Sequence, residues 1–470
     1  MKKSKKVVSL LLSASMMAAL ISGCGSSSGE GSTGSTTTPK AQKKDIGANG
    51  VPGVDDAALA DMLVEAASDP LYSEICVSDP TCTNGILPPM YDSRADIDKA
   101  IPEDAGSYTA DEIKIGYQIY MYDNDWFTEI AEGAKAAAED YGVELVIVSA
   151  EGSDEGCLRA VENLITQGCQ GVLLNAVSLD VNNKLANMCT EADVMCVGAG
   201  IMVGEETGVL TSCTTNNFGS AKASGQVLAE KLSGEHIKAA CSLSYWGETN
   251  AESRMAGFTA GVFSYRNEEN NMGYTEVECE TKAVQFWQEV RQNGSASSDE
   301  FDFEICSVGE SNNTEEGGQK TAENAFTAHP DINAFFANND FEGVGVTNGA
   351  RNMGITLGEG GCWVVSANDG YIKALDMIKD GEYLTTCDGG SYANGYAAVA
   401  LLCEILLNGY DANDLTPLTC SAYEPINESN MDKYYIEGAV LSRGTPSEPQ
   451  TISEYNKAQA EALSTETASE

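Results

Sequence analysis

Short apolar stretches with a two-residue period alternate with longer stretches of helical period from residue 113 to about residue 447. A period of two is typical of strands, whereas apolar residues at three- and four-residue steps are typical of helices. We predict strands at 113–120, 143–150, 171–177, 194–200, 208–213, 239–246, 303–309, 334–340, 363–369 and 384–390. We predict helices at 126–141, 154–167, 180–192, 217–233, 249–263, 315–328, 341–353, 370–380 and 392–408. This alternation predicts parallel sheets covered by helices on both faces, and it is too long for one compact sheet, so we expect two α/β units.

The first strand of this region leads into a turn that is rich in potential ligand contacts. Open α/β sheets bind ligands at the carboxyl ends of their strands, where this turn would lie. Carboxylates and an amide can bond to hydroxyl groups, and two flat rings can cover the apolar face of a sugar. The alternative is an ordinary turn in which Asp125 caps the helix and Trp126 enters the core. The turn consists of Tyr122, Asp123, Asn124, Asp125, Trp126 and Phe127.

The N-terminal residues are typical of an export signal. Lysines precede an apolar run, Val7–Ile21, that is too short for a permanent membrane span. The run leads into Ile21-Ser22-Gly23-Cys24, which resembles the lipobox of bacterial lipoproteins. The resemblance implies a signal peptide at 1–23, a diacylglycerol on Cys24 and a place on the outer face of the cytoplasmic membrane. Residues 24–44, rich in Gly, Ser and Thr, would form a tether. A plain signal peptide with an incidental cysteine is the alternative.

Charge and cysteine spacing exclude several classes of function. The formal net charge of −44 argues against nucleic acid and anionic membrane surfaces as electrostatic partners. The cysteines include no CxxC pair, and the two histidines are far apart, so we expect no metal site. Cys76 and Cys82 are the best disulfide candidates, whereas Cys169, Cys196, Cys241 and Cys403 lie in apolar runs and are predicted to be buried.

Three segments fall outside the alternation of strands and helices. Residues 45–111 are predicted to form an N-terminal extension, and residues 264–300 an insertion. Residues 448–470 are predicted to form a polar tail. Between residues 113 and 447 the chain has no GxSxG, P-loop or HExxH motif, so we expect no catalytic residues, no cofactor and no enzyme activity.

Five stretches, in order, resemble the periplasmic sugar-binding proteins of ATP-driven transporters, of the ribose and galactose/glucose type. They are IGYQIYMYDNDWF, QGCQGVLLNAVSLDV, GETNAESRMAGF, TAHPDINAFFANNDFEGVG and VVSANDGYIKALDMIKDGEY. The resemblance covers about 113–445 and implies two doubly wound parallel-sheet lobes joined by a three-strand hinge. The lobes would comprise 112–216 with 390–420 and 217–389 with 421–447. The ligand would bind between them, where hinge closure traps it.

The resemblance also implies which residues contact the ligand. Trp126 would stack on a sugar ring, Arg254 would offer a fork of donors, and the amides and carboxylates would bond hydroxyls. For Arg254 the alternative is a surface ion pair with Glu248 or Glu252. For Asn339 it is a helix cap, a role that Asp340 could share. The implied contacts are Asp123, Asn124, Trp126, Phe127, Asn175, Arg254, Asn313, Asn339, Asp369 and Asp388.

The sequence also departs from the family. Gly198-Ala199 replace an Asp-Arg pair of the ribose type, and Asn313 stands where the galactose/glucose type has a stacking tryptophan. That second stacking face is therefore missing or supplied by Trp246. A late binding amide aligns near Gly389, with Asp388 adjacent. The calcium loop of the galactose/glucose type is shortened to Ser233-Gly234-Glu235, so we predict no calcium there.

The resemblance implies a monomeric, lipid-anchored binding protein that delivers a small-molecule sugar to an ABC permease. Two alternatives stay open from the sequence. One is a sensory receptor of the same fold that binds a nucleoside or signal molecule for a two-component system. The other is a surface enzyme or adhesin.

Overall fold

The computed structural model describes residues 100–444, apart from 202, 204–206, 275, 413, 414, 416, 417 and 422. The predicted signal peptide, Cys24, the tether, most of the 45–111 extension, the Cys76–Cys82 pair and the polar tail lie outside the described residues. Within the described chain, no helix is both long and apolar enough to span a membrane.

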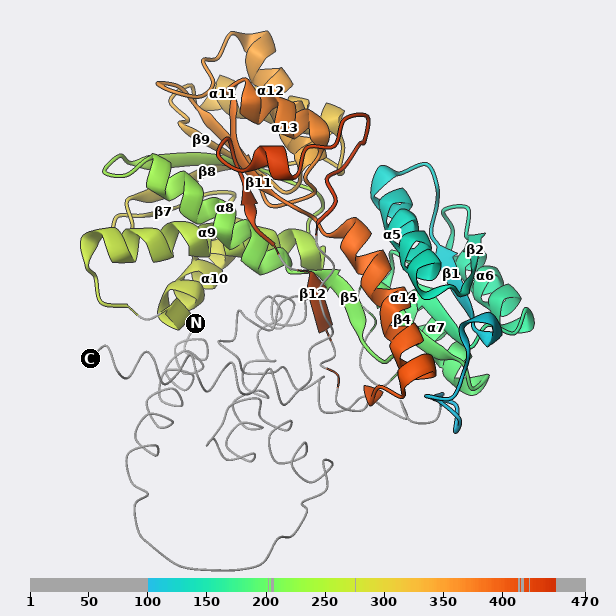
Figure 1. Ribbon diagram of the computed structural model, residues 1–470. Helices are drawn as coiled ribbons and strands as arrows, with labels where there is room; N and C mark the ends of the chain where they lie inside the picture. Colours follow the sequence, from blue (N-terminus) through green and yellow to red (C-terminus); the bar gives the residue numbers. More distant parts are fainter. Residues whose placement is uncertain are drawn as a thin grey trace, which may run out of the picture.

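The first sheet has six parallel strands in the order β12-β5-β4-β3-β1-β2 within the described chain. They are β1 (Lys114–Ile119), β2 (Glu144–Ser149), β3 (Gly171–Leu174), β4 (Met195–Ala199), β5 (Ser212–Thr215) and β12 (Leu418–Ser421). The sheet is covered by α5 (Asp125–Tyr141) and α14 (Ser391–Asn408) on one face, and by α6 (Asp154–Thr166) and α7 (Leu179–Glu191) on the other. We call this unit the first lobe (Figure 1). The short helix η4 (Ala110–Glu112) precedes β1.

The second sheet has seven strands in the order β13-β11-β10-β9-β6-β8-β7 within the described chain, and only its edge strands β7 and β13 run antiparallel. They are β6 (Ile237–Leu243), β7 (Ala296–Ser298), β8 (Phe303–Glu310), β9 (Ala334–Ala337), β10 (Trp363–Ser366), β11 (Tyr383–Cys387) and β13 (Pro425–Ile426). One face carries α8 (Asn217–Lys231), α9 (Thr249–Asn270) and α10 (Glu276–Asn293), and the other carries α11 (Glu315–Ala328), α12 (Asp340–Met353) and α13 (Ile372–Lys379). We call this unit the second lobe; the short helix η6 (Met431–Lys433) belongs to its last segment.

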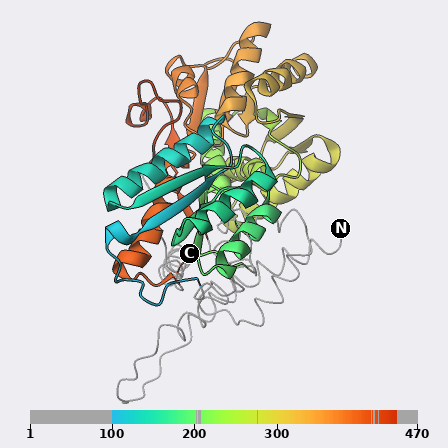
Figure 2. The same ribbon diagram turned by 90° about the vertical axis from the view of Figure 1, so that its right-hand side faces the viewer.

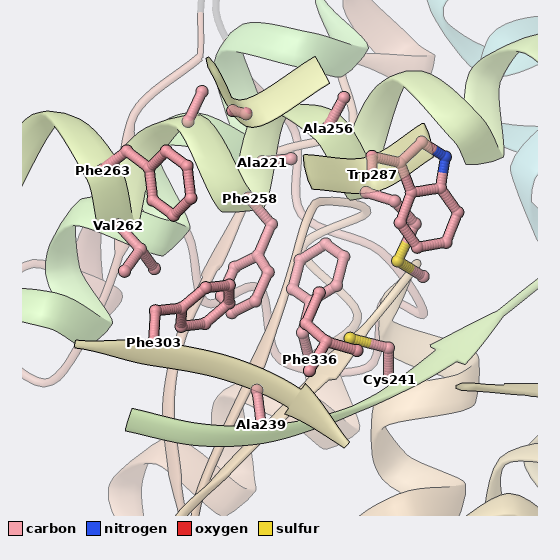
Figure 3. Packing of buried hydrophobic residues seen from close by; sticks show 14 of the residues in the cluster. Ala221, Ala239, Cys241, Ala256, Phe258, Val262, Phe263, Trp287, Phe303 and Phe336 are labelled. Atoms are coloured by element: carbon pink, nitrogen blue, oxygen red, sulfur yellow. The ribbon is translucent and has the colours of Figure 1, made fainter. Parts of the chain in front are cut away.

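Alternating side chains along each strand explain why both faces of each sheet are covered. In β3, Leu173 packs in the cluster under α5 and α14, while Val172 and Leu174 pack under α6 and α7. In β9, Phe336 faces α8 and α9, whereas Phe335 faces α12 and α13. Figure 3 shows the first of these second-lobe clusters, in which Phe258, Phe263, Phe303 and Phe336 meet between helix and sheet. The predicted pair of parallel α/β units is therefore confirmed.

The structure corrects the sequence prediction in three places. The predicted strand 208–213 is β5, which lies at 212–215. Residues 264–300 continue α9 and then form α10 and β7, so this segment is ordered secondary structure against the second lobe. The edge strands β12 and β13 were not predicted, because neither forms an apolar run bounded by polar turns. The described cysteines at 169, 196, 241 and 403 are buried free thiols, as predicted.

The chain passes between the lobes after β5, after β11 and between β12 and β13 (Figure 1 and Figure 2). Strands β5 and β11 each end at a crossing. Parallel strands of one sheet have their carboxyl ends at the same edge, so the carboxyl edge of each sheet lies beside the crossings. Thr215 Oγ1 donates to the Gly389 carbonyl at 2.5 Å and so bonds two crossings together. Arg443 Nε donates to Glu129 Oε2 at 3.1 Å, which joins the last segment to α5.

Helices α5 and α14 approach each other closely, because a glycine of each lies against the backbone of the other. A Cβ at Gly133 would lie 1.9 Å from the Tyr392 carbonyl oxygen, and one at Gly395 would lie 1.9 Å from the Ile130 carbonyl oxygen. We expect Gly133→Ala to lower the free energy of unfolding by about 1–3 kcal/mol, because the helices must separate. Urea denaturation measures this, with exposed Lys135→Ala on the same helix as the control. Equal stability of the two variants would contradict the close approach.

Candidate functional site

The turn after β1 holds its polar residues at the carboxyl edge of the first sheet. Asn124 is the cap of α5, and its Oδ1 accepts from the Trp126 backbone N–H at 2.9 Å. The alternative in which Asp125 caps the helix is therefore wrong, since Asp125 is the first helical residue. Asp123 is exposed beside the cap, and the Asn124 side chain is half-buried. The amide oxygen of Asn124 therefore uses one lone pair for the helix cap, and its N–H₂ group remains a potential donor.

Trp126 is the one aromatic side chain of this turn that reaches both lobes. Its ring meets Phe127 edge-on at 5.2 Å between centroids, and it lies against Gly200, where a Cβ would come within 2.7 Å of the indole. The indole packs on the first-lobe cluster and also on the second-lobe cluster that contains Tyr371 and Leu441. It is half-buried, whereas Phe127 is 8% exposed and belongs to the first-lobe core. Trp126 is thus placed where the lobes approach each other.

Arg254 occupies the facing edge of the second lobe. Its Nε donates to Asn217 Oδ1 at 2.9 Å, and its Nη1 donates to the Asn338 carbonyl at 3.3 Å. Burial lowers the pKa of the guanidinium, and the charges of Asp369, Glu248 and Glu342 oppose that shift. Glu252, one of the two surface partners considered from the sequence, is instead fully buried and bonds to Trp287 Nε1 at 2.5 Å. The guanidinium is therefore held by Asn217 and the Asn338 carbonyl, within electrostatic range of carboxylates from separate elements.

Glu342 is the best-enclosed of these carboxylates. It accepts from Ser242 Oγ at 2.7 Å and from Ser244 Oγ at 2.5 Å, and it has no exposed surface. Burial raises its pKa to about 7. Asn339 caps α12 by accepting from the Glu342 backbone N–H at 3.1 Å, and its amide donates to Asn313 Oδ1. The cap alternative for Asn339 thus holds, and the same amide also links Asn313 to this group.

Asp369 combines burial with an unusual backbone. It follows β10 with φ of 109°, a conformation that residues with a side chain rarely adopt, and it is only 6% exposed. Such strain persists only where surrounding contacts enforce it, and it is concentrated at functional sites. Burial raises the pKa of Asp369 to about 8, and the charge of Arg254 acts in the opposite direction. A buried carboxylate beside a guanidinium is suited to bind a ligand that donates hydrogen bonds.

Two of the predicted contacts serve the scaffold in this conformation. Asn175 is fully buried, and its Nδ2 donates to the Ala199 carbonyl at 2.6 Å, so it ties β3 to β4. Asp388 accepts from the Gly390 N–H at 3.1 Å and from Ser442 Oγ at 3.2 Å, so it ties a crossing to the last segment. The structure brings Arg254, Asn313, Asn339 and Asp369 together in the second lobe, and it places Asp123, Asn124 and Trp126 on the first.

Several polar residues at this edge were missed in the sequence. In the sequence, Glu342 resembles any acidic residue in the first turn of a helix. In the structure, it is bound by serines about a hundred positions earlier in the chain. Asn338 is 1% exposed and accepts from Ser244 Oγ at 3.0 Å. Asn368, next to Asp369, is fully buried, and its amide makes no hydrogen bond within the described chain. Unsatisfied buried groups are rare enough to need an explanation, so we count Asn368 as a candidate contact.

The buried carboxylates predict that the ligand-free protein loses stability as the pH rises. Folding raises the pKa of Asp340 to about 6, of Glu342 to about 7 and of Asp369 to about 8. The folded state therefore binds more protons than the unfolded state across this range, so the free energy of unfolding falls with increasing pH. Each pKa unit corresponds to about 1.4 kcal/mol. We expect the melting temperature to be lower at about pH 8 than at about pH 5.

The variant Asp369→Asn separates this effect from general charge repulsion. It retains the shape of the side chain but cannot ionise, so the part of the pH dependence that Asp369 contributes should disappear. Thermal unfolding of both proteins across the same pH series measures the difference. If the melting temperature of the variant and of the parent fell equally with pH, folding would not raise the pKa of Asp369.

The arrangement offers one guanidinium, several carboxylates, amide groups and an indole at neighbouring sheet edges. Such groups can bond many hydroxyls and cover one apolar face. Among the described residues, no group of three or more His, Cys, Asp or Glu side chains is placed to hold a metal ion.

Residues 115–410 match the family described as periplasmic binding protein domain. Solved structures with the same fold include an ABC transporter solute-binding protein from Mycobacterium smegmatis with bound glycerol, at 18% identity, a TM-score of 0.53, and 70% of this chain and 99% of that chain covered. Another is a periplasmic ribose ABC transporter protein from Conexibacter woesei, at 18% identity and a TM-score of 0.54. That match covers 70% of this chain and 96% of the other. A glucose-galactose binding protein from Geobacillus stearothermophilus matches at 19% identity and a TM-score of 0.52. That match covers 68% of this chain and 98% of the other. No curated protein matches the chain.

Proposed function

Because this chain belongs to the periplasmic binding protein family, we propose that it is the sugar-binding component of an ABC transporter, held outside the cell membrane by a lipid on Cys24. The family is one of solute-binding proteins rather than enzymes. The site between the lobes therefore holds and releases its ligand without transforming it. The type I periplasmic binding protein fold supplies the two lobes that such trapping requires.

The observation that carries the choice of a sugar is the convergence on Arg254. A buried carboxylate, Asp369, and the amides of Asn313 and Asn339 belong to the same edge of the second sheet. Donors and acceptors in such density suit a small molecule with many hydroxyls. The indole of Trp126, which touches both lobes, supplies the apolar surface that one face of a sugar ring needs. Similar solved structures that are named for ribose, for glucose and galactose, or for arabinose support the same class of ligand.

A thermal-shift screen with pentoses, hexoses and nucleosides tests the ligand class. A ligand present at 100 times its Kd should stabilise the folded state by about 2.7 kcal/mol, which raises the melting temperature by several degrees. Calorimetric titration of each hit then gives Kd. A shift with a pentose or hexose is the expected result. A shift with nucleosides alone would favour the sensory receptor, and conversion of a sugar during titration would contradict a binding role.

Lipid attachment is tested separately on the full chain. In a bacterial host, the parent protein should fractionate with membranes and incorporate labelled fatty acid, whereas Cys24→Ser should do neither. Release of the parent chain as an unlabelled soluble protein would show that the export signal is not that of a lipoprotein. Sugar binding by the released chain would still support the binding role.

A further inference from the structure

An exposed aromatic surface lies beside the candidate site, at the end of β6. Tyr245 and Trp246 are 42% and 41% exposed, and they are consecutive aromatic side chains. On one side of this pair, Ser244 Oγ bonds to Glu342 and Asn338. On the other side, the charge of Glu248 favours the charged form of Arg254 and so raises its pKa. The aromatic pair is therefore flanked in the chain by one residue that bonds to the candidate site and one that interacts with it electrostatically.

The Trp246 ring is held in place from behind. It stacks on Trp287 of α10, with 5.8 Å between centroids and 8° between planes. Trp287 is fully buried, and its position in the core cluster is visible in Figure 3. Its indole N–H donates to Glu252 Oε2 at 2.5 Å. The segment 264–300, which the sequence marked as an insertion, thus supplies the support for an exposed indole.

The backbone around Trp246 is fixed as well. The Trp246 N–H donates to Glu310 Oε1 at 3.2 Å, and the next N–H, of Gly247, donates to Glu252 Oε1 at 2.9 Å. The Tyr245 hydroxyl donates to the Asn312 carbonyl at 3.1 Å. A surface that is rigid before binding loses little conformational entropy when a ligand stacks on it.

We propose that Trp246 forms a second sugar subsite, which stacks on the next ring of an oligosaccharide whose first ring occupies the site at Arg254 and Asp369. This inference rests on the proposed sugar-binding function and extends it to a longer ligand. One aromatic face matches the area of one sugar ring, and the carboxylate of Glu310, which accepts from the Trp246 N–H, can also accept from a hydroxyl. A stable protein partner buries about 800 Å² on each side, far more than two side chains present.

The test is calorimetric titration of the parent protein with glucose, galactose, and their β-1,4- and α-1,4-linked di- and trisaccharides. We expect the best disaccharide to bind about three- to tenfold more tightly than its monosaccharide, as one added aromatic stacking contact allows. Trp246→Leu keeps an apolar cover over Trp287 but removes the ring, so the gain should disappear while the monosaccharide Kd stays unchanged. Trp246→Tyr should retain part of the gain. Tyr435→Leu, at an aromatic side chain of similar exposure whose hydroxyl bonds to Asp376, is the control and should retain all of it.

Each other outcome overturns the subsite. Monosaccharide binding without a gain for longer sugars would show that the site ends at one ring. A gain that persists in Trp246→Leu would assign it to another surface, and an equal loss for mono- and disaccharides would place Trp246 in the first subsite. Unchanged sugar affinities with impaired uptake in cells would make Trp246 a permease contact. Absence of binding to any sugar by the parent protein would reject the proposed function itself.

Discussion

Arg254→Met should weaken ligand binding by about 3 kcal/mol or more, which is roughly 100-fold in Kd. The charges of Asp369, Glu248 and Glu342 act on the guanidinium, and its fork can bond a ligand while it balances their charge. Methionine keeps an unbranched apolar stem of similar length but offers no donor and no charge. The ligand would then meet carboxylates without the group that orients it. Calorimetric titration with the best sugar from the screen measures the loss.

The matched control is Arg351→Met. Arg351 belongs to α12 of the same lobe and pairs with Glu382 at the surface, away from the convergent carboxylates. Surface pairs contribute about 0–1 kcal/mol, so this variant should bind like the parent. A circular dichroism spectrum establishes that both variants fold. Binding by Arg254→Met within about twofold of the parent would remove Arg254 from the site.

Arg254→Lys gives the finer test of geometry. It keeps the positive charge but replaces a planar fork of donors with a single ammonium group. If the fork is required, lysine should recover only part of the lost affinity. Full recovery would mean that charge alone matters, and the bonds to Asn217 and the Asn338 carbonyl would then be structural.

The lobes could be predicted from the sequence because the regular spacing of apolar residues continues over most of the chain. Each strand of four or more residues that is buried on both faces, such as β3 or β9, forms an apolar run bounded by polar turns. The order of strands could not be predicted, since it depends on which crossovers pack together. The edge strands β12 and β13 depend on pairing with β5 and β11 far away in the chain, so their own residues give no signal.

The candidate site could be predicted only in part. Strand ends are visible in the sequence, so residues such as Asp369 and Asn339 could be placed at a sheet edge. The direction of a side chain depends on its neighbours in space. Asn175 lies just after β3, inside the strand predicted at 171–177, and its amide turns to the Ala199 carbonyl of the adjacent strand. Asn124 and Asp125 are both short acceptors, and only the backbone geometry shows that the former caps α5.

Trp126 illustrates how one side chain can carry both a binding role and a conformational one. Phe127 lies next to it, but its ring is buried among first-lobe residues alone. The indole of Trp126 packs on clusters from both lobes. A ligand that stacks on this indole would therefore be in contact with the surface that changes when the lobes open or close. The two aromatic residues differ in function although the sequence places them side by side.

Trp126→Ala should weaken ligand binding by about 2 kcal/mol or more, roughly 30-fold in Kd, because stacking area and interlobe packing are lost together. Phe127→Leu should instead lower the free energy of unfolding with little change in Kd, since that ring fills the first-lobe core. Calorimetry and urea denaturation on both variants give the two quantities independently. Small-angle scattering should also show a more open average shape for Trp126→Ala without ligand. If Trp126→Ala lost stability but bound the sugar as tightly as the parent, the indole would be a core residue, and the stacking surface of the site would have to lie elsewhere.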